Sequence, residues 1–248
     1  MDVLFLGTGT STGIPYINCN CATCLSDDPR DKRLRSSVIV TVKNKNVLID
    51  CGPDFRQQVL RNKITDISAV LITHEHYDHL NGIDDLRNFG STPIYAEKRV
   101  CDIILRNLPY CFGESKYPGV PQISLNEIEN KPFNIDDIPI IPIRVAHSVL
   151  PILGFRIERF AYITDVSYID DAELSKLSDL DVLVVDALRL KSHFSHFSLQ
   201  EALDFAQSTK AKKVYLTHMS HEMGKQAETE KRLPDNVFFA YDGLKISL

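Results

Sequence analysis

The segment ITHEHYDHLNG concentrates side chains that can bind metal ions, namely His74, His76, Asp78 and His79. It follows the apolar run 69–72, which predicts a buried strand. Imidazole nitrogens and carboxylate oxygens are common metal ligands, and a rigid strand end presents them with little freedom to lose. His74 and His76 can reach one ion from an extended chain, and Asp78 and His79 can face a second. Desolvating these groups without metal would be costly, so the segment predicts a two-metal site rather than a solvated turn.

Similar side chains recur at the ends of other predicted strands and before one predicted helix: His147, Asp165, His193, His196, His218 and His221. A lone histidine or aspartate in such a place usually caps the element or satisfies a polar neighbour. Their recurrence after several separate strands instead favours one metal centre, with ligands drawn from distant parts of the chain.

Three of the six cysteines, Cys19, Cys21 and Cys24, lie in one short loop. In a reducing compartment such a trio indicates a metal more than disulfides. A tetrahedral structural zinc needs four sulfur or nitrogen ligands, so one is missing from the loop. His221 is the best candidate, because it lies three residues after His218 and has no other assigned role. The alternative is a set of free buried thiols.

Short apolar runs predict strands at residues 3–6, 38–42, 47–49, 69–72, 140–145, 154–157, 162–164, 182–185 and 214–216. Helical patterns lie between them at residues 54–61, 78–89, 98–107, 171–177 and 199–208. Grouped strands with interspersed helices predict an α/β fold of two packed sheets with outer helices, in one domain over residues 1–248. The tail 237–248 predicts two short strands around the turn Asp242–Gly243.

Two irregular segments stand out between these elements. Residues 7–13, GTGTSTG, have neither the spacing of the dinucleotide fingerprint nor the Gly-Lys-Ser/Thr of a P-loop. They predict a turn built for close backbone approach. Residues 109–122 combine prolines, glycines and aromatic side chains, which predicts a lid, a binding loop or a surface loop folded onto itself.

Charge and hydropathy restrict the partners. The formal net charge of -5 gives no basic footprint for nucleic acid, so extended nucleic acid is not expected. No apolar run reaches the 18 residues of a membrane span, and the start MDVLFLGTG does not fit a signal peptide. We therefore expect a cytoplasmic protein without a membrane partner.

The spacing HxHxDH, followed by distant His, Asp and His, resembles the metallo-β-lactamase superfamily. The resemblance implies the αββα sandwich of two mixed sheets with outer helices. The ligands that it implies for a first ion are His74, His76 and His147. For a second ion they are Asp78, His79 and His218, with Asp165 bridging the two. Residues 48–52, LIDCG, resemble the acidic motif of the superfamily, in which Asp50 would orient a ligand histidine; otherwise Asp50 is a turn residue.

Four motifs together, GTGTSTGIP, CNCATC, HxHxDH and THMSH, resemble the PhnP group, phosphodiesterases that act on cyclic ribose phosphates. The resemblance implies a structural zinc on Cys19, Cys21, Cys24 and His221. The catalytic residues that it implies are Asp78, which also binds metal, and His196, the general acid for the leaving alkoxide. A hydroxide bridging the two ions would be the nucleophile. His193 is the rival for the acid, and helix capping is the alternative role of His196.

We therefore expect a binuclear metal-dependent phosphodiester hydrolase, with Zn, Mn or Fe in the active site, since His and Asp ligands suit all three. Its partners would be a small phosphodiester substrate and at most a second copy of the chain in a homodimer. Alternatives on the same scaffold are a thioesterase, a lactonase or an RNA-processing nuclease. From another class, a non-catalytic carrier related to the PQQ-biosynthesis proteins remains, although the complete metal motif favours hydrolysis.

Overall fold

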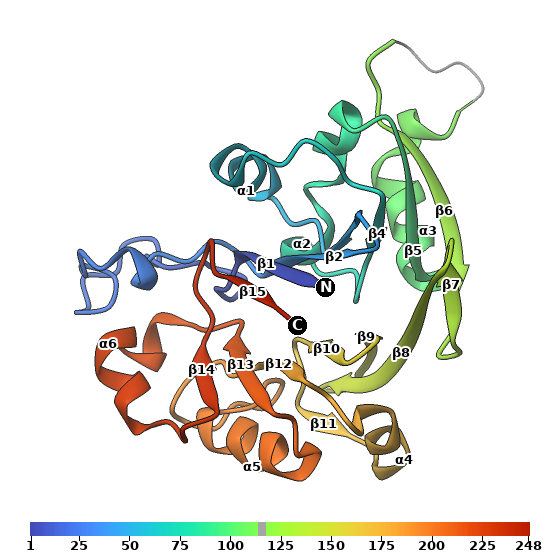
Figure 1. Ribbon diagram of the computed structural model, residues 1–248. Helices are drawn as coiled ribbons and strands as arrows, with labels where there is room; N and C mark the ends of the chain where they lie inside the picture. The colour runs from blue at the N-terminus through green and yellow to red at the C-terminus, as the bar shows by residue number, and fades with distance from the viewer. Residues whose placement is uncertain (114–117) are drawn as a thin grey trace.

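Two β-sheets face each other in the computed structural model, which describes residues 1–113 and 118–248 (Figure 1). The first sheet contains, in spatial order, β15 (Lys245–Ser247), β1 (Asp2–Gly7), β2 (Ser37–Val42), β3 (Lys45–Ile49), β4 (Ala69–Leu71), β5 (Ser91–Glu97) and β6 (Gln122–Ile128). The second contains β11 (Tyr168–Ile169), β8 (Ile138–His147), β9 (Leu150–Ile157), β10 (Phe160–Ile163), β12 (Val182–Asp186), β13 (Lys213–Thr217) and β14 (Val237–Phe239), with β7 (Phe133–Ile135) paired to β8. Both sheets mix parallel and antiparallel pairs.

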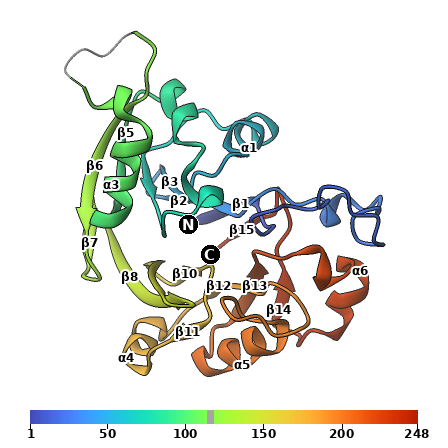
Figure 2. The same cartoon turned by 180° about the vertical axis from the view of Figure 1, so that it is seen from behind.

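Helices lie outside the two sheets. The α-helices are α1 (Phe55–Asn62), α2 (Tyr77–Leu80), α3 (Lys98–Asn107), α4 (Asp171–Leu174), α5 (Leu199–Thr209) and α6 (Gln226–Thr229). Short 3₁₀ turns are η1 (Pro29–Asp31), η2 (Ile83–Asn88), η3 (Pro109–Cys111), η4 (Ser175–Leu177), η5 (His221–Met223) and η6 (Glu230–Arg232). In the view from behind, α1 and α3 flank the first sheet, and α4 and α5 flank the second (Figure 2).

The buried side chains form three layers because successive residues of a strand point to opposite faces. In β3, Val47 and Ile49 pack between the sheets, whereas Leu48 packs outward with Phe55 of α1 and Ile104 of α3. The outer face of the second sheet packs against α5 in the same way. The αββα sandwich expected from the sequence is thus confirmed.

The predicted helix 78–89 is wrong in extent, because the chain leaves the helix after α2 and continues as η2. The Gly82 N–H donates to the Cys51 carbonyl at 2.8 Å. A Cβ on Gly82 would lie 2.0 Å from the Gly52 carbonyl oxygen. This backbone contact with a distant segment interrupts the helix. Likewise, the predicted helix 171–177 divides into α4 and η4.

The tail does not form a hairpin around its Asp-Gly turn. Its first strand, β14, pairs with β13 in the second sheet, whereas β15 pairs with β1 in the first. This brings the two ends of the chain close together (Figure 1). The side chain of Asp242 accepts hydrogen bonds from the Thr8 hydroxyl and the Leu34 N–H, both at 2.8 Å, so the turn is fixed to the loop between β1 and β2.

The segment 109–122 begins with η3 and ends where β6 starts. Its residues 114–117 lie outside the described residues, so a role as lid or binding loop stays a prediction. Among the helices of residues 1–113 and 118–248, none is long and apolar enough to cross a membrane.

Substituting Gly82 with alanine should destabilise the fold, because the new methyl group would meet the Gly52 carbonyl. We expect the free energy of unfolding to fall by about 1–3 kcal/mol, the usual cost of overpacking. Gly113→Ala is the matched control, because its nearest neighbour lies 4.0 Å from the added Cβ. Chemical denaturation measures both variants. Equal stability of the two would show that the Gly52–Gly82 contact imposes no constraint.

Candidate metal centre

Loops that follow strands of both sheets meet at one edge of the sandwich. One ligand-type atom from each of four residues lies within 4.8 Å of the others: His74, His76, His147 and Asp165. The same criterion groups a second set: Asp78, His79 and His218. The first sheet supplies the residues after β4, and the second supplies those at the ends of β8, β10 and β13. The structure therefore brings together all the side chains predicted as active-site ligands.

Asp165 lies between the two clusters. Besides belonging to the first, its Oδ2 lies 3.2 Å from His79 Nε2 and 3.3 Å from His218 Nδ1 in the second. One carboxylate thus reaches both groups, as a bridging ligand must. Its bridging role stays a prediction.

Several ring nitrogens point into the centre without a hydrogen bond. In the described part of the chain, His74 Nε2, His79 Nε2 and His218 Nδ1 are buried and have no hydrogen-bond partner. Buried polar atoms are almost always satisfied, and leaving one unpaired costs about 1–3 kcal/mol. Metal ions between the clusters would accept these lone pairs, so the residues fit such ions.

In His74 and His79, the ring nitrogens that point away from the centre contact protein oxygens. His79 Nδ1 lies 2.7 Å from the carboxylate of Asp50, which is completely buried. The Thr73 hydroxyl lies 3.0 Å from the same carboxylate and 2.9 Å from His74 Nδ1. Asp50 therefore orients one histidine directly and a second through Thr73, as expected for a partner of ligand histidines.

Burial keeps two of the imidazoles neutral. It lowers the pKa of His74 well below its ordinary value, and it lowers the pKa of His218 to about 4. Neutral rings keep the lone pair that a metal needs.

His79 shows that the centre is short of positive charge. Burial alone would lower the pKa of His79, but the carboxylates of Asp78, Asp165 and Asp50 together raise it well above its ordinary value. Buried carboxylates need a compensating charge. Divalent cations would supply it, which is a second reason why these residues fit metal ions.

His196 lies at the edge of the two clusters. Its ring centroid is 4.6 Å from that of His147 and 5.1 Å from that of His218. His196 Nδ1 lies 2.8 Å from the carboxylate of Asp186, the last residue of β12. Burial lowers the pKa of His196, but the Asp186 carboxylate outweighs it and raises that pKa to about 9.

Sequence reasoning missed Asp186, although it ends an apolar strand in the same way that Asp50 and Asp165 follow theirs. An aspartate at the end of an apolar strand was the sequence pattern that could have identified Asp186. His193, the rival for the acid, lies farther out: its ring centroid is 5.4 Å from that of His196, and its Nδ1 contacts Ser195 Oγ at 3.2 Å. His193 is not among the grouped ligand-type residues of the described chain.

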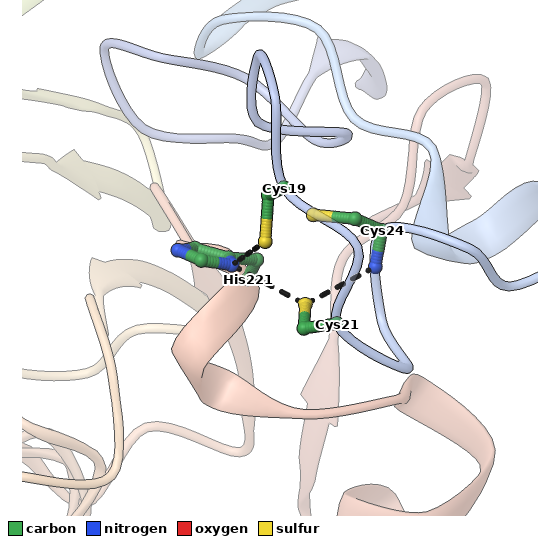
Figure 3. Close-up of side chains that lie close together, drawn as sticks. All are labelled: Cys19, Cys21, Cys24 and His221. Atoms are coloured by element: carbon green, nitrogen blue, oxygen red, sulfur yellow. Dashed lines mark hydrogen bonds between the residues drawn. The ribbon is translucent and has the colours of Figure 1, made fainter.

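The cysteine loop forms a separate cluster with His221 (Figure 3). Sγ of Cys19 and Sγ of Cys21 each lie 3.3 Å from His221 Nδ1, and Cys24 completes the group. Although burial favours the thiol, hydrogen bonds from the Cys24 N–H and His221 lower the pKa of Cys21 to about 6. Three sulfurs and one imidazole nitrogen match the donor set of a structural zinc, so these residues fit that ion.

The fold and these clusters define the class of protein. The family described as the beta-lactamase superfamily domain matches residues 45–219, from the start of β3 to just beyond His218. The chain therefore belongs to the metallo-β-lactamase superfamily and has its αββα hydrolase fold. Within the superfamily it resembles the PhnP family. A solved structure described as a new diphosphatase from that family has a TM-score of 0.93 and 38% identity, covering 100% of this chain and 97% of the other.

Two further relatives extend the comparison. Zinc-bound PqqB of Methylobacterium extorquens has a TM-score of 0.83 over 100% of both chains, and its 20% identity shows the fold alone. The octanoyltransferase of Porphyromonas gingivalis is 40% identical over 99% of this chain and 51% of that protein. The chain spans about half the length of the first curated relatives that it matches.

Asp165→Ala should disturb both ions at once if one carboxylate bridges them. We expect lower occupancy of two metals and a loss of hydrolysis by several orders of magnitude, because metal catalysis depends on both ions. His193→Ala is the comparison variant and should do little. Elemental analysis and kcat/KM measure the two effects. A more damaging His193 change would mean that the ligand set is misassigned.

Cys21→Ser should remove one tightly bound zinc and lower thermal stability, because thiolates are preferred zinc ligands. The active-site metals should stay. Asn20→Ser, at an exposed position of the same loop, is the control. Elemental analysis and thermal unfolding test this prediction. Unchanged zinc content and stability in Cys21→Ser would refute it.

Proposed function

We propose that the chain is a two-metal phosphodiesterase that acts on cyclic or nucleotide-type phosphodiesters. The observation that carries the proposal is a pair of adjoining ligand clusters, joined by Asp165, with His196 at their edge. The likeness to a PhnP-family diphosphatase supports it, because that name also describes hydrolysis at phosphorus.

The chain's own contribution is to hold its donors in place. Bound divalent ions would neutralise charge on the phosphoryl oxygens and bring the pKa of a water molecule near neutrality. His74 and His79 are tied from behind through Thr73 and Asp50, so their metal-facing nitrogens have little freedom. The exposed side chain of His76 leaves the first cluster open to solvent, where a small substrate can enter.

We assign His196 as the general acid. In the charged ring, which the raised pKa of about 9 favours, both nitrogens carry a proton: Nδ1 donates its own to Asp186, and the Nε2 proton would pass to the leaving oxygen. Asp186 positions the ring and stabilises its charged form, as carboxylates do behind catalytic histidines. The rival role is a metal ligand, since His196 also groups with Asp165 and His218.

The charge of the chain favours a small substrate. With a formal net charge of -5, the protein has no overall attraction for polyanions, so we prefer a low-molecular-weight phosphodiester to RNA.

The octanoyltransferase relative favours a second candidate, hydrolysis of an acyl thioester. That protein is about twice as long as the matched part, so its named activity is not assigned to the half that resembles this chain. The ligand set suits attack at a carbonyl carbon as well as at phosphorus. The phosphodiester remains our preference because the PhnP-family relative matches over nearly its whole length.

An activity panel separates the candidates. Protein reconstituted with Mn, Zn or Fe is given a cyclic ribose phosphate, a linear dinucleotide, a dinucleoside diphosphate and octanoyl-coenzyme A. We expect hydrolysis of at least one phosphorus substrate with a kcat/KM well above that of the thioester. Preferential thioester hydrolysis would replace the proposal, and no turnover with any metal would favour a non-catalytic carrier.

His196→Ala should affect substrates according to their leaving groups. A ribose alkoxide leaves poorly unless it is protonated, whereas a nitrophenolate leaves without a proton. General-acid help is worth about 10²–10⁴-fold where it is needed. We therefore expect kcat/KM to fall by that factor for a cyclic ribose phosphate and far less for bis(p-nitrophenyl) phosphate.

Metal content must be quantified in the same preparations, with His193→Ala as the control in the same loop. Unchanged metal together with unequal losses on the two substrates supports the assignment. Equal losses would mean that His196 binds phosphate, and loss of an ion would mean that it is a ligand.

A further inference from the structure

The glycine-rich segment 7–13 is unexplained by any phosphate-binding motif, yet it lies directly against the metal centre. The Thr10 N–H donates to the Met219 carbonyl at 3.0 Å, and the Met219 N–H donates to the Thr8 carbonyl at 3.0 Å. These two bonds join the segment to the residue that follows His218. The backbone of the N-terminal loop is therefore fixed beside one of the proposed ligands.

From this position the Thr10 side chain reaches the ligand itself. Thr10 Oγ1 lies 3.1 Å from His218 Nε2, and both side chains are buried. The opposite ring nitrogen, Nδ1, faces Asp165 in the centre. We propose that Thr10 is a positioning residue that fixes the orientation and the tautomer of His218. This inference rests on the two-metal centre of the proposed function.

The argument follows from the chemistry of imidazole. A neutral ring has one N–H and one lone pair, on different nitrogens. If His218 Nδ1 gives its lone pair to a metal, the proton must lie on Nε2. Thr10 Oγ1 is the atom within reach of that proton, and it can accept it. Hydrogen bonds of this kind fix the tautomer and raise the basicity of the ligand nitrogen.

Three of the other four histidines of the centre show the same arrangement, the exception being the exposed His76. The nitrogens that point away from the centre are bonded to protein oxygens: His79 to Asp50, His74 to Thr73, and His147 to the Ser195 carbonyl at 2.8 Å. Within residues 1–113 and 118–248, Thr10 is the partner that the structure gives to His218 Nε2. With Thr10, the buried His218 has the same kind of partner as the other three.

The glycines explain how Thr10 comes so close. A Cβ on Gly7 would lie 2.0 Å from the Arg35 carbonyl oxygen, and one on Gly9 would lie 3.0 Å from both Cβ and the carbonyl oxygen of Arg33. Side chains at these positions would push the loop away from its neighbours. The glycines therefore allow the loop that carries Thr10 to pack closely against residues 33–35.

Metal affinity tests the proposal, with Zn²⁺ as the probe and a competing chelator to measure it. Thr10→Val removes the hydroxyl, retains a side chain of similar shape and leaves the backbone bonds to Met219 in place. We expect the dissociation constant of one active-site ion to rise about 10–100-fold, the usual effect of losing such a partner. Thr10→Ser should restore most of the affinity.

Thr12→Val is the matched control, because Thr12 is exposed and its hydroxyl donates to the Gly13 carbonyl at 3.5 Å, away from His218. It should bind zinc like the wild type. Wild-type affinity in Thr10→Val, or an equal loss in Thr12→Val, would overturn the proposal. Zinc binding is measured without substrate, so failure of phosphodiester hydrolysis would not count against Thr10.

A second measurement does not depend on a variant that folds. Nitrogen-15 spectra of the histidine rings in the zinc-loaded wild type report which nitrogen carries the proton. We expect the His218 proton on Nε2, in slow exchange with water, and zinc on Nδ1. A proton on Nδ1, or zinc on Nε2, would overturn the proposal.

Discussion

The carboxylate of Asp50 connects the two strand ends on which half of the centre is built. It follows β3, it is completely buried, and it accepts a hydrogen bond from the Thr73 N–H at the end of β4 at 2.9 Å. A buried carboxylate is costly unless it is paired, so these contacts and the one to His79 must be kept together. The orientation of His74 and His79 follows from that requirement. Two residues after Asp50, Gly52 lies against the backbone of Asp78, where a Cβ would come within 2.0 Å of the Asp78 carbonyl oxygen.

The second sheet supplies the other half of the metal centre. Residues in both halves have a strained backbone conformation. Asp50, Asp165 and His218 all adopt the left-handed conformation, with φ of 64°, 54° and 58°. For residues other than glycine this conformation costs on the order of 1 kcal/mol or more each, and such residues cluster at functional sites. Here each follows a strand and turns a polar side chain inward. Ions that join ligands from both sheets would offset this strain and connect the two halves of the sandwich.

Much of this arrangement follows from local sequence pattern. Continuous apolar runs predict the buried strands, and the HxHxDH spacing predicts ligands at the end of β4. Contacts between distant segments were harder to predict. The helix expected at 78–89 is cut short because Gly82 touches Gly52, thirty positions earlier. Asp186 looks like any aspartate at a strand end until the fold brings His196 to it. The tail strands β14 and β15 likewise pair in different sheets, because their partners β13 and β1 lie far away in the sequence.

The most direct test of the account is anomalous diffraction from crystals of the protein loaded with manganese in the active site and zinc in the cysteine cluster. The account predicts two ions about 3.5–4 Å apart, the usual spacing of two-metal sites, with the Asp165 carboxylate on both. It also predicts a zinc among Cys19, Cys21, Cys24 and His221, and no ion bound to His196. A single ion in the active centre, or one held by His196, would contradict it.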